Sequence, residues 1–454
     1  MKKLPHFICN LLLLLSCFTG HGQLDKQQLR KLDEFLSDKF QPSGPGCVVL
    51  VAQRGETVYQ KAVGSANIEL NVPMRPDMVF NLASITKQFT AVAILQLVDQ
   101  GKLSLTDSIQ KFLPDFPSMG HTVTIENLLT HTSGIKDYLQ LNYTGINMER
   151  WDFSPGQLVD SFKFHEREFA PGTRFSYSNS GYYLAGYIIE KVSGKRYQAY
   201  IEENLLAPLG LAHTFFDSAG IIIPNRVNGY RTEDGRNKNA DYWSPSIEYA
   251  AGGLLSTVFD LLTWHKGLYS GRLLKKETLQ KAFTPFLLKD GTRTGYGYGW
   301  YIKTSNGITS IEHQGGLPGF QTNEIYFPGE DVFIAILCNS GAAPVDALSI
   351  GVSAIVLKKS LQADIEVDSK ILDRYLGTYQ LSIDKKRTLD IIRMNGVLVA
   401  KVSEQEFIPL LFQTETKFQF KNLLNADCEF IVEDGKVIRF NANQNGHYEW
   451  LKIK

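Results

Sequence analysis

The sequence predicts an α+β domain followed by a smaller antiparallel β domain. In the first part of the chain, strands lie near both ends of a stretch that is mostly helices and loops between about 105 and 270. A polar break at Asp364–Asp368 follows. Beyond Tyr375, apolar and polar residues alternate, as they do in half-buried strands. We therefore expect one domain over 23–362 and another over 370–454.

The first domain is expected to begin with a helix and two strands. Residues 26–40 carry leucine and phenylalanine at helical spacing. Two apolar stretches, 47–52 and 57–62, flank a turn at Arg54-Gly55, which predicts a pair of strands.

A long helix is expected over 84–100. It is apolar on nearly all sides, which predicts a central rather than a surface helix. Strands return at 300–302 and 325–337, and 347–361 is predicted to close the domain as a helix.

The last 80 or so residues form the second predicted domain. Turn signals recur at Asn395-Gly396, Asp434-Gly435 and Asn445-Gly446 between alternating segments. This pattern is typical of an antiparallel meander or a small barrel.

The N-terminus is predicted to be a leader. A basic start precedes an apolar run with five consecutive leucines, Leu11–Leu15, and small residues follow. This organisation indicates a secretory signal peptide over 1–22, cleaved near Gly22. The alternative is a lipobox ending in Cys17, which would make the protein lipid-anchored. Either way we expect an exported protein, periplasmic or extracellular, with no transmembrane segment in the mature chain.

Composition excludes several functional classes. Basic and acidic residues number 47 each, so the formal net charge is zero. A nucleic-acid partner or a polybasic membrane surface needs a concentrated positive field, which this chain lacks. The sequence does not indicate an oligomeric state.

The main candidate for chemistry is Ser84-Ile85-Thr86-Lys87. Residues three apart share one helical face, so the hydroxyl and the amine lie one turn apart. A lysine in apolar surroundings loses its proton more easily and can act as a base. The motif occurs four times, at Ser84, Ser108, Ser133 and Ser382, and its usual role is a helix cap beside a solvated lysine. Ser84 differs from the other three because its lysine, Lys87, lies at the start of an apolar helix.

Two further segments support Ser84. Tyr177-Ser178-Asn179 is the only Tyr-x-Asn among 20 tyrosines, and it lies in a loop before an apolar helix over 182–192. His313-Gln314-Gly315-Gly316 precedes a strand-rich segment. Each alone is typical of an ordinary loop residue, but their appearance together and in this order points to a site.

In this order the motifs resemble those of the serine β-lactamase and penicillin-binding-protein superfamily. They are most similar to the class C β-lactamase-like group of esterases, D-aminopeptidases and D-Ala-D-Ala carboxypeptidases. The resemblance covers roughly 26–362. It implies an antiparallel sheet flanked by helices with a mostly helical subdomain, and the last domain resembles the β-barrel appendages of some of these hydrolases. Further matching phrases are Leu128–Gly134, Ala251–Asp260 and Gly315–Gly319.

The resemblance also implies roles. Ser84 would attack a carbonyl and form an acyl-enzyme, and Lys87 and Tyr177 would share acid–base work, with the identity of the base left open. Asn179 would bind substrate and orient Lys87. The backbone N–H groups of Ser84 and Gly316 would form the oxyanion hole, with His313 and Gly315 in the same substrate-binding motif. The substrate would be a small molecule or a peptide, and we expect no metal and no cofactor.

One departure from the group bears on the substrate. True β-lactamases of this group usually carry Lys-Thr-Gly as the third motif, whereas this chain has His313-Gln314-Gly315. Histidine is mostly neutral near pH 7, so a permanent anchor for a carboxylate is missing. We therefore expect an esterase or peptidase rather than an efficient β-lactamase.

The sequence bears on three alternative functions. An α/β-hydrolase is disfavoured because no Gly-x-Ser-x-Gly occurs. A zinc peptidase is disfavoured because the His165-Glu166 segment has Phe169 where the second histidine would stand. A non-hydrolytic penicillin-binding or sensor protein on the same fold is the third.

Overall fold

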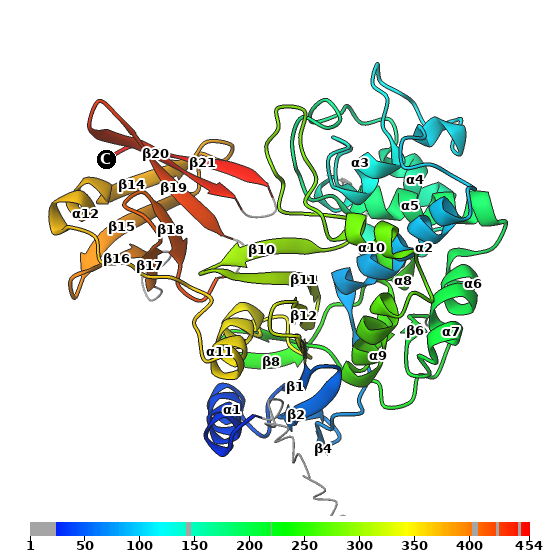
Figure 1. Cartoon of the computed structure of the whole chain (residues 1–454), viewed down its shortest axis with the longest axis horizontal. Helices are drawn as coiled ribbons and strands as arrows, with labels where there is room; N and C mark the ends of the chain where they lie inside the picture. Colours follow the sequence, from blue (N-terminus) through cyan, green and yellow to red (C-terminus); the bar gives the residue numbers. More distant parts are fainter. Residues whose placement is uncertain (1–23, 142–146, 219, 402–406, 424–425, 444–445) are drawn as a thin grey trace, which may run out of the picture.

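The computed structural model describes residues 24–141, 147–218, 220–401, 407–423, 426–443 and 446–454 (Figure 1). The predicted leader, with Gly22 and Cys17, lies outside these residues. None of the described helices is both long enough and apolar enough to cross a membrane.

The first part of the chain is built on one antiparallel sheet of six strands. Its order is β10-β11-β12-β13-β1-β2, so the two ends of this region meet where β1 pairs with β13. The strands are β1 (Cys47–Gln53), β2 (Glu56–Val63), β10 (Tyr301–Ser305), β11 (Ile308–Leu317), β12 (Phe320–Phe327) and β13 (Val332–Cys338).

Helices cover both faces of this sheet. Along β1, Val48 and Leu50 face a core shared with the central helices, while Val49 and Val51 face a second core under α1 and α11. Burial on both faces explains why β1 is an apolar run without alternation. The helices concerned are α1 (Lys26–Lys39), α2 (Thr86–Asp99), α5 (Asn179–Ser193), α8 (Pro245–Gly252), α9 (Val258–Tyr269) and α11 (Val345–Leu357).

The remaining helices and short strands lie mainly between α2 and β10. The predicted helix-and-loop region therefore also contains short strands. These elements are β3 (Ser65–Asn67), β4 (Val72–Pro73), β5 (Phe80–Asn81), α3 (Ile125–Leu129), α4 (Pro155–Phe162), α6 (Tyr197–Ile201), α7 (Ala207–Leu209), β6 (Phe215–Phe216), β7 (Tyr230–Glu233), β8 (Arg236–Asn239), β9 (Leu254–Ser256) and α10 (Lys276–Ala282).

Several boundaries differ from the prediction. The closing helix expected over 347–361 is α11, which ends at Leu357, and the helix expected over 182–192 is α5, which begins at Asn179. The helix expected from residue 84 begins instead at Thr86, after a 3-10 turn η1 (Ala83–Ile85) whose first residue, Ala83, has a positive φ of 50°. The strand expected over 325–337 is a hairpin of β12 and β13, and Asp331, with φ of 50°, lies in its turn.

The C-terminal part forms a closed antiparallel barrel of eight strands, as the alternating pattern indicated. Each strand pairs with its neighbour in sequence, and β14 pairs with β21 to close the ring. The predicted boundary near residue 365 falls between α11 and α12. The elements are α12 (Ser369–Tyr375), β14 (Gly377–Leu381), β15 (Thr388–Met394), β16 (Val397–Lys401), β17 (Phe407–Phe412), β18 (Lys417–Phe420), β19 (Asp427–Glu433), β20 (Lys436–Asn443) and β21 (His447–Lys452).

Candidate active site

Ser84 lies in the η1 turn, where the sheet and the helical region meet. Asn81 fixes this turn, since its side-chain oxygen accepts a hydrogen bond from the Ala83 N–H at 2.9 Å. Thr322 of β12 donates its hydroxyl to the Leu82 carbonyl at 2.9 Å. A Cβ at Gly315 would stand 2.2 Å from that carbonyl oxygen, so only glycine lets β11 approach the turn.

Lys87 is fully buried directly below Ser84. Its Nζ lies 2.9 Å from Ser84 Oγ, 2.9 Å from Asn179 Oδ1 and 2.8 Å from the Ala251 carbonyl oxygen. The three partners come from three separate parts of the chain. Two of them belong to the Tyr177–Asn179 motif and the Ala251–Asp260 segment. The sequence linked these segments to Ser84 only through the order of the motifs along the chain.

Burial lowers the pKa of Lys87 from 10.5 to about 7, and the nearby Asp137 carboxylate partly opposes this shift. A substantial fraction of the amine is therefore neutral near pH 7. A neutral amine has two N–H groups and one lone pair. Asn179 Oδ1 and the Ala251 carbonyl are acceptors only, so they take the two N–H groups and leave the lone pair for the Ser84 hydroxyl.

Asp137 is a site residue that the sequence did not indicate. Its Oδ2 accepts a hydrogen bond from Asn179 Nδ2 at 3.0 Å, so the acid reaches Lys87 through an intervening amide. Asp137 is buried, and burial raises the pKa of its carboxyl. No local pattern marks this residue, since the contact joins positions 42 apart in sequence.

Tyr177 shares a side-chain hydrogen bond with Ser84, and Lys87 Nζ lies 4.9 Å from the centroid of the Tyr177 ring. Burial raises the pKa of the Tyr177 phenol well above its usual range, which keeps the hydroxyl protonated. The His131 ring packs against the Tyr177 ring at 4.1 Å between centroids. His131 Nδ1 also accepts a hydrogen bond from the Ser178 N–H at 3.0 Å, so the Leu128–Gly134 segment holds the loop that carries Tyr177 in place.

The third motif lies within β11, where some of its residues are buried behind the site and others face the cavity. His313 is buried, and its ring nitrogens contact the Tyr296 hydroxyl at 2.9 Å and the Gln314 carbonyl at 2.6 Å. Burial, followed by the Lys87 charge, lowers the pKa of His313 to about 3, so the ring is neutral. The Gln314 side chain donates to Asp346 of α11, away from Ser84. Gly316 is exposed and lines the cavity beside Ser84.

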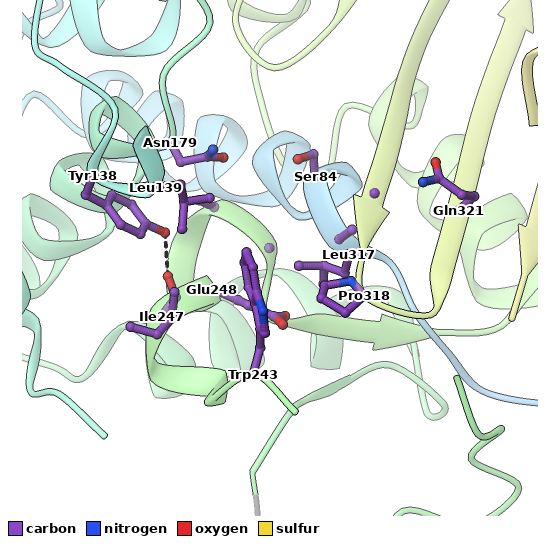
Figure 2. A pocket seen from close by; sticks show the side chains of 14 residues that line it. Ser84, Tyr138, Leu139, Asn179, Trp243, Ile247, Glu248, Leu317, Pro318 and Gln321 are labelled. Carbon is purple, nitrogen blue, oxygen red and sulfur yellow. Dashed lines mark hydrogen bonds between the residues drawn. The ribbon is translucent and has the colours of Figure 1, made fainter. Parts of the chain in front are cut away.

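A cavity of about 400 Å³ opens over Ser84 (Figure 2). Ser84 and Asn179 line one side, and Trp243, Glu248 and Pro318 line the other. No lysine, arginine or histidine lines this cavity in the described part of the chain. Among the described residues that line it, Glu248 is the one with a carboxyl group.

Glu248 is largely buried in that wall. Its Oε2 accepts a 3.3 Å hydrogen bond from Asn81 Nδ2, which links it to the turn that carries Ser84. Burial, with a smaller effect from the Asp217 carboxylate, raises the pKa of Glu248 well above its usual range. A cationic group entering the cavity would reverse that effect by favouring the ionised carboxylate.

The structure thus brings together Ser84, Lys87, Tyr177, Asn179 and Gly316. His313 and Gly315 are buried behind the residues that line the cavity. Among the described residues, no group of three or more His, Cys, Asp or Glu side chains is arranged to hold a metal ion.

Comparisons with known proteins identify a family and several relatives. The family model described as "Beta-lactamase" matches residues 28–353. Penicillin-binding protein 4* of Bacillus subtilis is 27% identical over 94% of this chain and 98% of its own length.

Two solved structures are similar in fold and sequence. The octameric penicillin-binding protein homologue from Pyrococcus abyssi is 27% identical, with a TM-score of 0.65, over 92% of this chain and 99% of its own. A D-stereospecific amidohydrolase from Streptomyces sp. is 26% identical, with a TM-score of 0.63, over 73% of this chain and 99% of its own.

Proposed function

The chain belongs to the beta-lactamase family, and from this premise we propose that it is a serine hydrolase that forms an acyl-enzyme on Ser84 and cleaves an amide or ester bond. The observation that carries the proposal is the 2.9 Å contact between Ser84 Oγ and the buried amine of Lys87, at the floor of a cavity. A serine is a weak nucleophile until an adjacent base takes its proton.

Lys87 is the base in this proposal and Tyr177 is the proton relay. The Lys87 lone pair takes the Ser84 proton as Oγ attacks the carbonyl carbon. The Tyr177 hydroxyl then donates its own proton to the leaving amine or alkoxide and recovers one from Lys87. A phenolate base is disfavoured at Tyr177, because burial keeps its hydroxyl protonated. In the second half-reaction water replaces the leaving group, and the same protons move in reverse.

The cavity favours a substrate without a carboxylate close to the scissile bond. Its walls carry no cationic side chain among the described residues, and His313 is neutral and turned toward Tyr296. Glu248 instead offers an acceptor to a hydrogen-bond donor. We infer that the substrate presents an amino group there, as the amide of a D-amino acid does, in line with the Streptomyces amidohydrolase.

We also propose that the protein is exported, on the strength of the N-terminal pattern alone. Intact mass of the protein secreted by a bacterial host should place the mature N-terminus at Gln23. A diacylated N-terminus at Cys17 would replace cleavage near Gly22 with lipid anchoring, and an intact Met1 in the cytoplasmic fraction would contradict export.

Covalent labelling tests the nucleophile. A fluorophosphonate probe should add one adduct on Ser84, and Ser84→Ala should abolish the adduct and lower kcat/KM by roughly 10⁴-fold or more. Ser382→Ala, in another Ser-x-x-Lys, is the matched control and should label normally. Intact mass spectrometry with peptide mapping reads the result. An unlabelled, folded wild-type protein would refute the proposal.

A fluorescent penicillin distinguishes the remaining activities on the same protein. We expect little or no penicillin adduct. A penicillin adduct that is hydrolysed quickly would show β-lactamase activity. A penicillin adduct that persists, while no amide or ester is turned over, would favour a penicillin-binding or sensor protein.

Asp137→Asn tests the assignment of Lys87 as the base. Because the base must be neutral, kcat/KM should rise with pH through a midpoint near 7, the pKa of Lys87. The Asp137 carboxylate raises that pKa, so its removal should move the midpoint to lower pH. The plateau value of kcat/KM at high pH should fall on the order of tenfold, because Asn179 loses its charged partner. This fall is equivalent to about 1.4 kcal/mol in activation free energy.

The control for this profile is Asp290→Asn, an exposed carboxylate on a loop, which should leave the midpoint unchanged. A midpoint in Asp137→Asn that stays in place or moves upward would argue against Lys87 as the base.

Glu248→Gln tests the inferred amino group. The variant keeps an acceptor for Asn81 but cannot become a carboxylate. The ratio of kcat/KM for D-phenylalanine amide to that for its N-acetyl derivative should fall at least tenfold. Glu324→Gln, at a buried glutamate that does not line the cavity, should keep the wild-type ratio. An unchanged ratio in Glu248→Gln would remove the amino group from the substrate model.

A further inference from the structure

The C-terminal barrel is packed at one end and open at the other. At the packed end, Tyr375 of α12 stacks on Phe430 at 3.9 Å between centroids, and Phe418 stacks on Phe430 at 4.5 Å. Figure 1 places α12 at the end of the barrel away from the helical region. These large rings fill the interior there, as side chains do in small closed barrels.

The other end of the barrel is hollow. Every second residue of a barrel strand points inward, and the inward residues beyond the aromatic cluster line a cavity of about 1090 Å³. This barrel cavity is lined chiefly by Leu381, Leu389, Ile408, Phe420 and Trp450. Ile408, for example, shares its face of β17 with Leu410 and Phe412, which belong to the barrel core.

The barrel cavity lies next to the candidate active site. Its far wall includes Ser176 and Tyr177 of the hydrolase domain. Tyr177 is hydrogen-bonded to Ser84, and one short stretch of chain borders both cavities: Asp137 and Gln140 line the barrel cavity, while Tyr138 and Leu139 line the cavity over Ser84. An elongated substrate bound at Ser84 would therefore lie close to the barrel cavity.

The chemistry of the walls indicates what enters. On the barrel side the inward residues are aliphatic or aromatic, with Phe440 stacked against Trp450 at 5.7 Å between centroids. The charged residues of the wall are Asp384 and Arg387, an exposed pair 3.5 Å apart, and, on the side of Tyr177, Asp137, Glu168 and Arg174. The volume is at the upper end of that of small-molecule sites.

We propose that the barrel cavity binds an apolar group of the substrate, such as an acyl chain of about eight carbons, while the scissile bond lies at Ser84. This inference rests on the proposed function. It gives the C-terminal barrel a direct part in substrate selection, because an apolar chain leaves water when it enters the cavity.

The test compares p-nitrophenyl octanoate with p-nitrophenyl acetate on the full chain. Wild-type protein should show at least a tenfold higher kcat/KM for the octanoate. Ile408→Glu places a charge inside the barrel cavity and should lower the octanoate-to-acetate ratio at least tenfold. Val397→Glu, on an exposed side chain of the neighbouring β16, is the matched control and should keep the ratio. A ratio near one in the wild type, or an equal ratio in the two variants, would overturn the proposal.

A binding measurement separates this inference from the proposed function. In Ser84→Ala, calorimetry should detect p-nitrophenyl octanoate binding that Ile408→Glu in the same background weakens at least tenfold. Absence of binding to Ser84→Ala overturns the barrel-cavity proposal even if esters are hydrolysed. Binding without hydrolysis of either ester by the wild type supports the cavity and counts against the hydrolase.

Discussion

The site depends on a lysine amine that is removed from water without a carboxylate in direct contact. Desolvation of the ammonium form brings the pKa of Lys87 down to about 7, into the range where a base works at neutral pH. A direct ion pair would hold the proton on nitrogen. Asp137 reaches Lys87 only through the Asn179 amide, so its charge moderates the shift without cancelling it. The surrounding structure serves to hold this arrangement dry and fixed.

That arrangement carries a cost in stability. Lys87 has a folded-state pKa below the value of 10.5 for a solvated lysine, so between about pH 7 and 10.5 the unfolded chain binds more protons and stability rises with pH. The two cores on either side of the sheet, with β1 and β13 buried between them, provide the rigid base that tolerates this burial. Gly315 and Thr322 then fix the Ser84 turn to that sheet.

The sequence predicted the features of the site that depend on local spacing along the chain. Ser84 and Lys87 lie one turn apart in any helix-like segment, and the apolar run after Lys87 indicated its burial. Tyr177 and Asn179 were found by motif order. The alternation after residue 375 predicted strands, but barrel closure requires β14 to pair with β21, which no local signal specifies. Asp137 and Glu248 act through contacts across the fold, and the orientation of His313 toward Tyr296 follows from packing that the motif does not encode.

The most direct test of this account is the titration of Lys87 itself. Protein labelled with ¹³C at lysine Cε can be followed by NMR across pH 5 to 11, with the Lys87 resonance assigned by its loss in Lys87→Gln. A midpoint near 7 is expected for the Lys87 amine. A Lys87 midpoint near 10.5 would show that the amine stays charged beside Ser84, and it would contradict the central claim.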